Sequence, residues 1–124
     1  VDSAGTIDYH TGKLPDHRMR QAASFRGLDL AHRARQIDAR DLGKFDLILV
    51  MDQDNMRDVM RLDADGSSQH KIRLFCDFCT THSEKEVPDP YLRTASDFEF
   101  VLDLLEDGCT EIVRRIQAGT LLQN

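Results

Sequence analysis

The 124-residue sequence has no tryptophan, only three prolines and only three cysteines. No apolar run approaches the length of a membrane span, and the amino-terminal residues do not show the basic and apolar pattern of a secretion signal. With 16 basic and 22 acidic side chains, the net charge of -6 argues against nucleic acid or an anionic membrane as the main partner. The size and the 40% hydrophobic content are those of one folded domain.

The three cysteines are Cys76, Cys79 and Cys109, an odd number without the spacing of a disulfide framework. Reduced thiols in the cytoplasm are the simplest interpretation. Cys76 and Cys79 form a Cys-x-x-Cys pair, which leaves a redox role open, although the usual strand-to-helix setting is missing. A zinc site needs four ligands and only His82 lies nearby, so we predict no metal site.

Patterns typical of helices and strands alternate along the chain. Pro15 and Asp16 favour the start of a helix that ends at Gly27. Asp52 is placed to cap another helix. The expected strands cover residues 1–4, 45–51 and 71–75, with an extended piece at 34–37, and the expected helices cover 15–27, 38–42, 53–61 and a long segment that begins near 96.

The strand expected at residues 45–51 is apolar throughout rather than alternating, which indicates that helices cover both faces of its sheet. We therefore expect an α/β fold of three layers, in which helices flank a mainly parallel central sheet. Ligands on such sheets bind at the carboxyl ends of the strands, which places residues 3–9 and Asp52 near one rim.

The last helix is predicted from two features. Ser96 and Glu99 have the spacing of a capping box. Apolar residues follow at the helical period and should form a buried stripe. The stripe consists of Phe98, Val101, Leu102, Leu105, Cys109, Ile112, Val113 and Ile116.

Asp89 stands between Pro88 and Pro90 and is followed by Tyr91. The prolines fix two backbone angles and favour an extended conformation at the residue before each of them. A general acid needs such restraint, because proton transfer tolerates little positional slack. Taken alone, the segment is better explained as an ordinary turn that carries a solvated carboxylate.

Four segments together resemble the low-molecular-weight protein tyrosine phosphatase family, in the order and approximate spacing of that family. The helix that opens with Ser96 is similar to the last helix of the family. The resemblance covers nearly all of the chain. The segments are residues 1–6 (VDSAGT), 34–37 (ARQI), 45–52 (FDLILVMD) and 89–91 (DPY).

The resemblance implies that the protein hydrolyses phosphotyrosine or small aryl phosphates through a cysteinyl-phosphate intermediate, without a cofactor. Asp89 is then the general acid that protonates the departing phenol oxygen, and afterwards the base that activates water. Tyr91 and Tyr9 are similar to the two aromatic walls of the phenol pocket. Leu92 departs from the family, since many members have a second aromatic residue there.

Ser3, His32 and Asp52 resemble a polar network that holds the phosphate loop of the family in shape. The alternative is that Asp52 only caps a helix and His32 is a solvated loop residue. Both roles are compatible for Asp52, and we assign all three residues as supporting.

The family's nucleophile lies in a Cys-x5-Arg-Ser loop near the amino terminus, and no such loop precedes Val1. Cys109 and Arg115 have the spacing, but they lie on the predicted last helix, where we expect Cys109 in the core. We therefore expect residues 1–124 to be one phosphatase domain without its first strand, loop and helix, inactive by itself. Two alternatives are arsenate reduction on the same fold and a dead fragment that acts only by binding.

Overall fold

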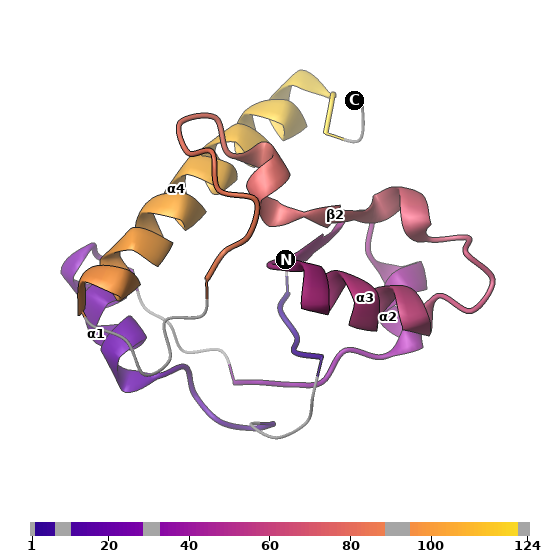
Figure 1. Cartoon of the computed structure of the whole chain (residues 1–124), viewed down its shortest axis with the longest axis horizontal. Coiled ribbons are helices and arrows are strands. Elements are labelled where there is room, and N and C mark those ends of the chain that lie inside the picture. Colours follow the sequence, from indigo (N-terminus) through magenta and orange to yellow (C-terminus); the bar gives the residue numbers. More distant parts are fainter. Residues whose placement is uncertain (1, 7–10, 29–32, 89–94, 122–124) are drawn as a thin grey trace.

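The computed structural model describes residues 2–6, 11–28, 33–88 and 95–121 (Figure 1). Within these described ranges, two strands and four α-helices follow one another with two short 3-10 turns. In chain order they are α1 (His17–Phe25), α2 (Ala39–Lys44), β1 (Ile48–Val50), α3 (Gln53–Leu62), η1 (Gln69–Lys71), β2 (Ile72–Leu74), η2 (Phe75–Phe78) and α4 (Ala95–Ala118).

Strands β1 and β2 are parallel, with Ile48 opposite Ile72 and Val50 opposite Leu74. A separate parallel bridge joins Gly5 to Gln36, which confirms extended structure in residues 34–37. The strand expected at residues 1–4 is wrong in position, because residues 2–4 are not in a strand and the pairing falls on Gly5. The strands expected at 45–51 and 71–75 are confirmed, with shorter bounds.

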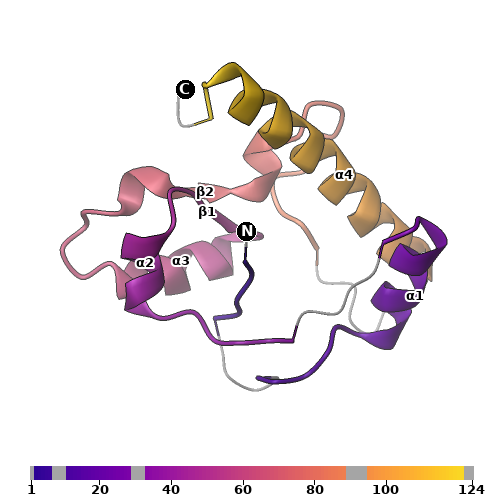
Figure 2. The same ribbon diagram turned by 180° about the vertical axis from the view of Figure 1, so that it is seen from behind.

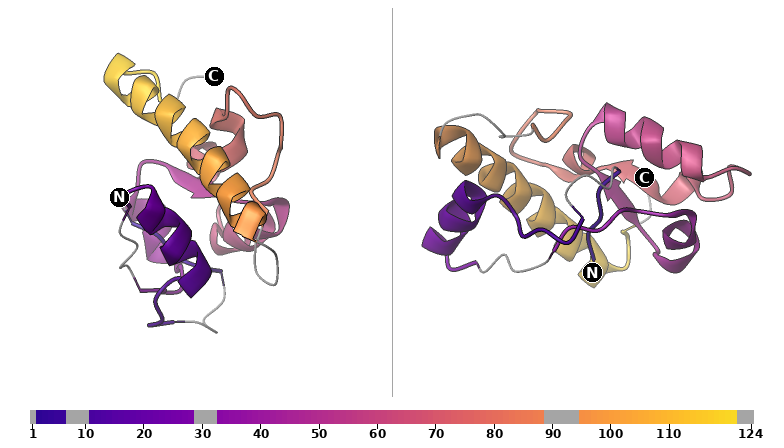
Figure 3. Two further views of the ribbon diagram at one scale, coloured as in Figure 1. Left: turned by 90° about the vertical axis from the view of Figure 1, so that its left-hand side faces the viewer. Right: turned by 90° about the horizontal axis from the view of Figure 1, so that it is seen from below.

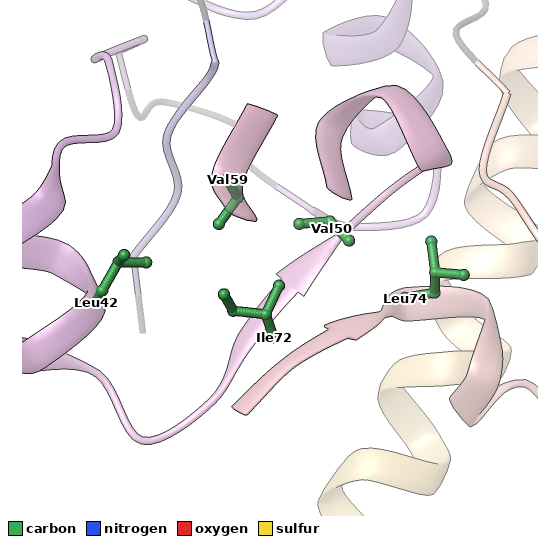
Figure 4. Packing of buried hydrophobic residues seen from close by; sticks show 5 residues of the cluster. All are labelled: Leu42, Val50, Val59, Ile72 and Leu74. Carbon is green, nitrogen blue, oxygen red and sulfur yellow. The ribbon is translucent and has the colours of Figure 1, made fainter. Parts of the chain in front are cut away.

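Alternate side chains of β1 enter two separate clusters. Ile48 packs against the first cluster, and Val50 is one of its buried members, near Val59 of α3 (Figure 4). Because successive strand side chains face opposite ways, Leu49 points toward the α4 side. The buried members of the first cluster are Leu42, Val50, Val59, Ile72 and Leu74.

The second cluster lies between the sheet and α4, with α4 and α1 on one side of the sheet and α2 and α3 on the other (Figures 1 and 2). Helices thus cover both faces, as the continuous apolar run of residues 45–51 predicts, and the α/β class with a parallel sheet is confirmed. The buried members of this cluster are Phe75, Cys76, Val87 and Val101.

Helix α1 packs along the first half of α4 (Figure 3). Asp16 caps α1 by accepting the Arg18 N–H, and Gly27 follows it at a φ of 78°, a left-handed conformation that glycine adopts easily. Arg26, at the end of α1, forms ion pairs with three carboxylates on α4, those of Glu99, Asp103 and Glu106.

Helix α4 differs from its prediction at both ends. It begins at Ala95, so Ser96 belongs to its first turn and is not the cap. Phe98, Val101 and Leu102 are buried as expected, but Val113 and Ile116 are more than half exposed. Cys109 is also exposed, which contradicts its expected place in the core. The periodicity is correct, but no described element covers these residues in the second half of the helix.

Candidate active site

The carboxyl end of β1 leads directly into α3 through Met51 and Asp52. The Asp52 side chain accepts a hydrogen bond from the Asn55 N–H at 2.8 Å and caps α3. This end of a parallel strand is where ligands bind in α/β folds. The capping role that the sequence suggests for Asp52 is therefore confirmed, while its part in a network with Ser3 and His32 stays a prediction.

The segment just before Asp89 is fastened to this same end of β1. The Val87 N–H donates to the Met51 carbonyl oxygen at 2.8 Å, and the Val87 side chain is buried. The Glu86 carboxylate accepts a hydrogen bond from the Gln53 N–H, the first amide of α3, at 2.6 Å. A carboxylate is favoured there, because the first amides of a helix are unpaired and its amino-terminal end is positive.

The beginning of the same segment is held by Asp107 of α4, whose side chain is only 5% exposed. Its oxygens accept the backbone N–H groups of Thr80, Thr81 and His82 at 2.9 to 3.0 Å. They also accept bonds from both threonine hydroxyls and lie 2.8 Å from His82 Nδ1. These donors, the Thr80 amide first, hold the pKa of Asp107 far below its usual range.

Most of the site residues named from the sequence lie outside the described residues: Asp89, Tyr91, Tyr9 and His32. Their assigned roles stay predictions. Ser3 is described and exposed, and its N–H donates to Asp2 Oδ1 at 2.8 Å.

All three cysteines are free thiols with raised pKa values. Burial raises the pKa of Cys76, and burial together with the nearby Cys76 raises the pKa of Cys79 to about 12. Partial desolvation raises the pKa of Cys109. Nucleophilic cysteines need the opposite shift, because the thiolate is the reactive form.

The Cys109 and Arg115 pair does not form an anion site. Both residues lie within α4, whose backbone amides are bonded inside the helix. Arg115 Nε donates to Glu111 Oε1 at 3.1 Å, and its guanidinium lies 5.0 Å from the centre of the Phe78 ring. The sequence prediction that this spacing is not a phosphate loop agrees with that geometry, although Cys109 is exposed rather than core.

Sequence reasoning missed Glu86 and Asp107. Glu86 lies in a highly charged stretch, where nothing marks one carboxylate among several. Asp107 lies on a helix whose acidic residues look like an ordinary solvated face. Only the fold shows that each accepts backbone amides of a segment distant in the chain.

Comparison with known proteins supplies the family. The family of low molecular weight phosphotyrosine protein phosphatases matches residues 1–121. The chain belongs to this phosphatase family. A Synechocystis protein named for the same family is 45% identical over 112 residues, which are 90% of this chain and 71% of that protein. The human low molecular weight phosphotyrosine protein phosphatase is 37% identical over 102 residues, 82% of this chain and 64% of the human protein.

Solved phosphatase structures agree with the fold described above. A protein tyrosine phosphatase from Entamoeba histolytica superposes with a TM-score of 0.91 at 38% identity, over 97% of this chain and 76% of that one. A low molecular weight phosphatase from Vibrio cholerae gives a TM-score of 0.83 at 32% identity, over 94% and 74% of the two chains. These relatives are named as phosphatases, which favours that reading of the chain over arsenate reduction.

No helix in the described part of this phosphatase-family chain has the length and apolar character needed to cross a membrane.

Proposed function

We propose that the protein carrying this chain is a protein tyrosine phosphatase, which hydrolyses phosphotyrosine in proteins or small aryl phosphates. The family match over residues 1–121 carries the proposal. The fastening of residues 86–87 to the carboxyl end of β1 supports it, because this places the segment that leads to Asp89 at the rim where such folds bind ligands.

In the proposed reaction a cysteine thiolate attacks phosphorus, and the phenol oxygen leaves with a proton from Asp89. Asp89 then removes a proton from the water that breaks the phosphorus–sulfur bond and releases phosphate. Two displacements replace one difficult step. Tyr91 and Tyr9 form the walls of a slot for the flat aryl ring. Ser3, His32 and Asp52 support the phosphate-binding loop.

We infer that the nucleophile of this reaction is none of the three cysteines in the sequence, since Cys109 lies within α4 and Cys76 and Cys79 lie at η2 with raised pKa values. We therefore expect residues 1–124, as a single domain, to give no turnover of p-nitrophenyl phosphate. Turnover by this chain that disappears in Asp89→Ala would contradict the assignment of the nucleophile. The free thiols support a cytoplasmic location, which is part of the proposal.

The central test uses the full-length protein and p-nitrophenyl and phenyl phosphates. Asp89→Asn should lower kcat for phenyl phosphate by roughly 10²- to 10⁴-fold, because it removes the proton donor without changing the size of the side chain. Asp77→Asn, at an exposed position on η2, is the matched control and should leave kcat unchanged. Equal rates for wild type and Asp89→Asn would refute the role of Asp89.

A further inference from the structure

The segment of residues 79–88 is attached to the rest of the molecule at two places with different chemistry. At its start, Asp107 accepts three consecutive backbone amides and is almost completely buried. At its end, Val87 and Glu86 bind the backbone of Met51 and Gln53. Residues 83–85 between these attachments are exposed.

The second attachment lies directly before the proposed acid. Because Val87 is anchored, the Cα atom of Asp89 has to lie within the length of two peptide units from it, about 7 Å. Pro88 restricts that space further, because its ring fixes φ. The attachment at Val87 therefore controls the position of the acid more closely than the one at residues 80–82 does.

The attachment at Val87 consists of one backbone hydrogen bond, one buried side chain and the Glu86 carboxylate. The backbone bond and the apolar contact hold Val87 alone. Glu86 adds a second fixed point, because its oxygen lies 2.6 Å from one particular amide at the start of α3. The bond is charge-assisted and therefore stronger than a neutral one.

We propose that Glu86 is a positioning residue for the general acid, acting by fixing residues 86–88 to the first amide of α3. This inference rests on the proposed function. Glu86 does not touch the substrate in this role. It sets the fraction of time during which the Asp89 carboxyl group is close enough to the leaving oxygen to transfer its proton.

The test compares leaving groups in the full-length protein. Phenolate is a poor leaving group and needs the proton, whereas p-nitrophenolate leaves readily without it. Glu86→Ala should lower kcat/KM for phenyl phosphate by roughly 3- to 10-fold, as expected for the loss of one charged hydrogen bond at an exposed position. The value for p-nitrophenyl phosphate should change much less.

Conservative and control variants separate positioning from general damage. Glu86→Gln keeps an acceptor oxygen at the same distance and should restore most of the phenyl phosphate activity. Glu84→Ala removes an exposed carboxylate two residues earlier and should leave kcat/KM unchanged for both substrates. If Glu84→Ala lowers phenyl phosphate turnover as much as Glu86→Ala, the effect is one of loop charge and the proposal is wrong.

Asp107→Asn serves as the structural comparator. It weakens the buried attachment, so it should lower the thermal midpoint more than Glu86→Ala does. The ratio of kcat/KM for phenyl phosphate to kcat/KM for p-nitrophenyl phosphate should stay near the wild-type value. A changed ratio in Asp107→Asn together with an unchanged ratio in Glu86→Ala would overturn the inference.

A double variant distinguishes failure of this inference from failure of the proposed function. In an Asp89→Asn background, Glu86→Ala should have no further effect on the substrate ratio, because there is no acid left to position. If Asp89→Asn itself leaves both substrates unaffected, the proposed function fails. If Asp89→Asn changes the ratio and Glu86→Ala does not, only the positioning role fails.

Discussion

The two halves of α4 carry the same apolar period but use it differently. In the first half the apolar residues are the covered ones, with Phe98, Val101 and Leu102 at most 4% exposed. In the second half the covered positions are Gly108 and Glu111, while Val113 and Ile116 face outward. A regular sequence period therefore does not by itself establish which face of a helix is buried.

The two most deeply buried residues in the second half are a small one, Gly108, and a charged one, Glu111. Gly108 lies so close to Phe75 that a Cβ atom there would be 2.4 Å from the ring. Glu111 is nearly buried and binds both Arg114 and Arg115. Arg115 in turn stacks over Phe78. Close backbone approach and ion pairing thus accompany the apolar contact of Ile112 where α4 passes η2.

The largest effect is expected at the fully buried Leu104. Leu104→Ala should lower the free energy of unfolding by about 2–5 kcal/mol, because it leaves a cavity between α4 and its neighbours. Val113→Ala, at a position that is 51% exposed, should change it by less than about 0.5 kcal/mol. Urea unfolding of both variants measures the contrast, and equal losses would mean that the two halves are buried alike.

A smaller loss is expected at Gly108, where the two halves meet. Gly108→Ala should cost about 1–3 kcal/mol, because the buried Phe75 ring has to move to admit the methyl group. Gly43→Ala is the matched control in α2, where a Cβ meets nothing within 4 Å. That change should stabilise the protein by about 0.5–1 kcal/mol in the same unfolding measurement. A neutral Gly108→Ala would contradict the close approach to Phe75.

The ion pairs of the second half should make stability depend on pH. Hydrogen bonds from Arg114 and then Arg115 lower the pKa of Glu111 to about 2. Because the folded pKa is below the unfolded one, this contribution is complete above the unfolded pKa of about 4.3 and is lost as the pH falls toward 2.

The thermal midpoint of wild type should fall as the pH is lowered from about 5 to about 2, and Glu111→Gln should make this fall less steep. Glu84→Gln removes an exposed carboxylate and is the control for the change in net charge. A Glu111→Gln curve parallel to that of wild type would show that the ion pairs do not stabilise the fold.

The smallest effect is expected for Ile116→Lys, on the outward face of the second half. At 57% exposure the side chain has little contact to lose, so the unfolding free energy should change by less than about 0.5 kcal/mol. A loss comparable with that of Leu104→Ala would mean that this face is covered in solution.

Local features of the fold could be predicted because their causes are local. Asp16 caps α1 and Asp52 caps α3, each through a side chain that accepts a backbone N–H of its own helix. The continuous apolar run around β1 indicates cover on both faces, and both clusters are present. The family resemblance also follows from short segments in order, and it is confirmed by the match over residues 1–121.

The sequence by itself determined the starts of α1 and α3, the buried parallel strand and the class of fold, because each leaves a pattern in neighbouring residues. Only the tertiary structure decided that Glu86 accepts the Gln53 amide, that Asp107 accepts the amides of residues 80–82, and that Cys109 is exposed. These contacts join residues 25 to 33 positions apart or depend on which element passes a helix, and no local pattern encodes that choice.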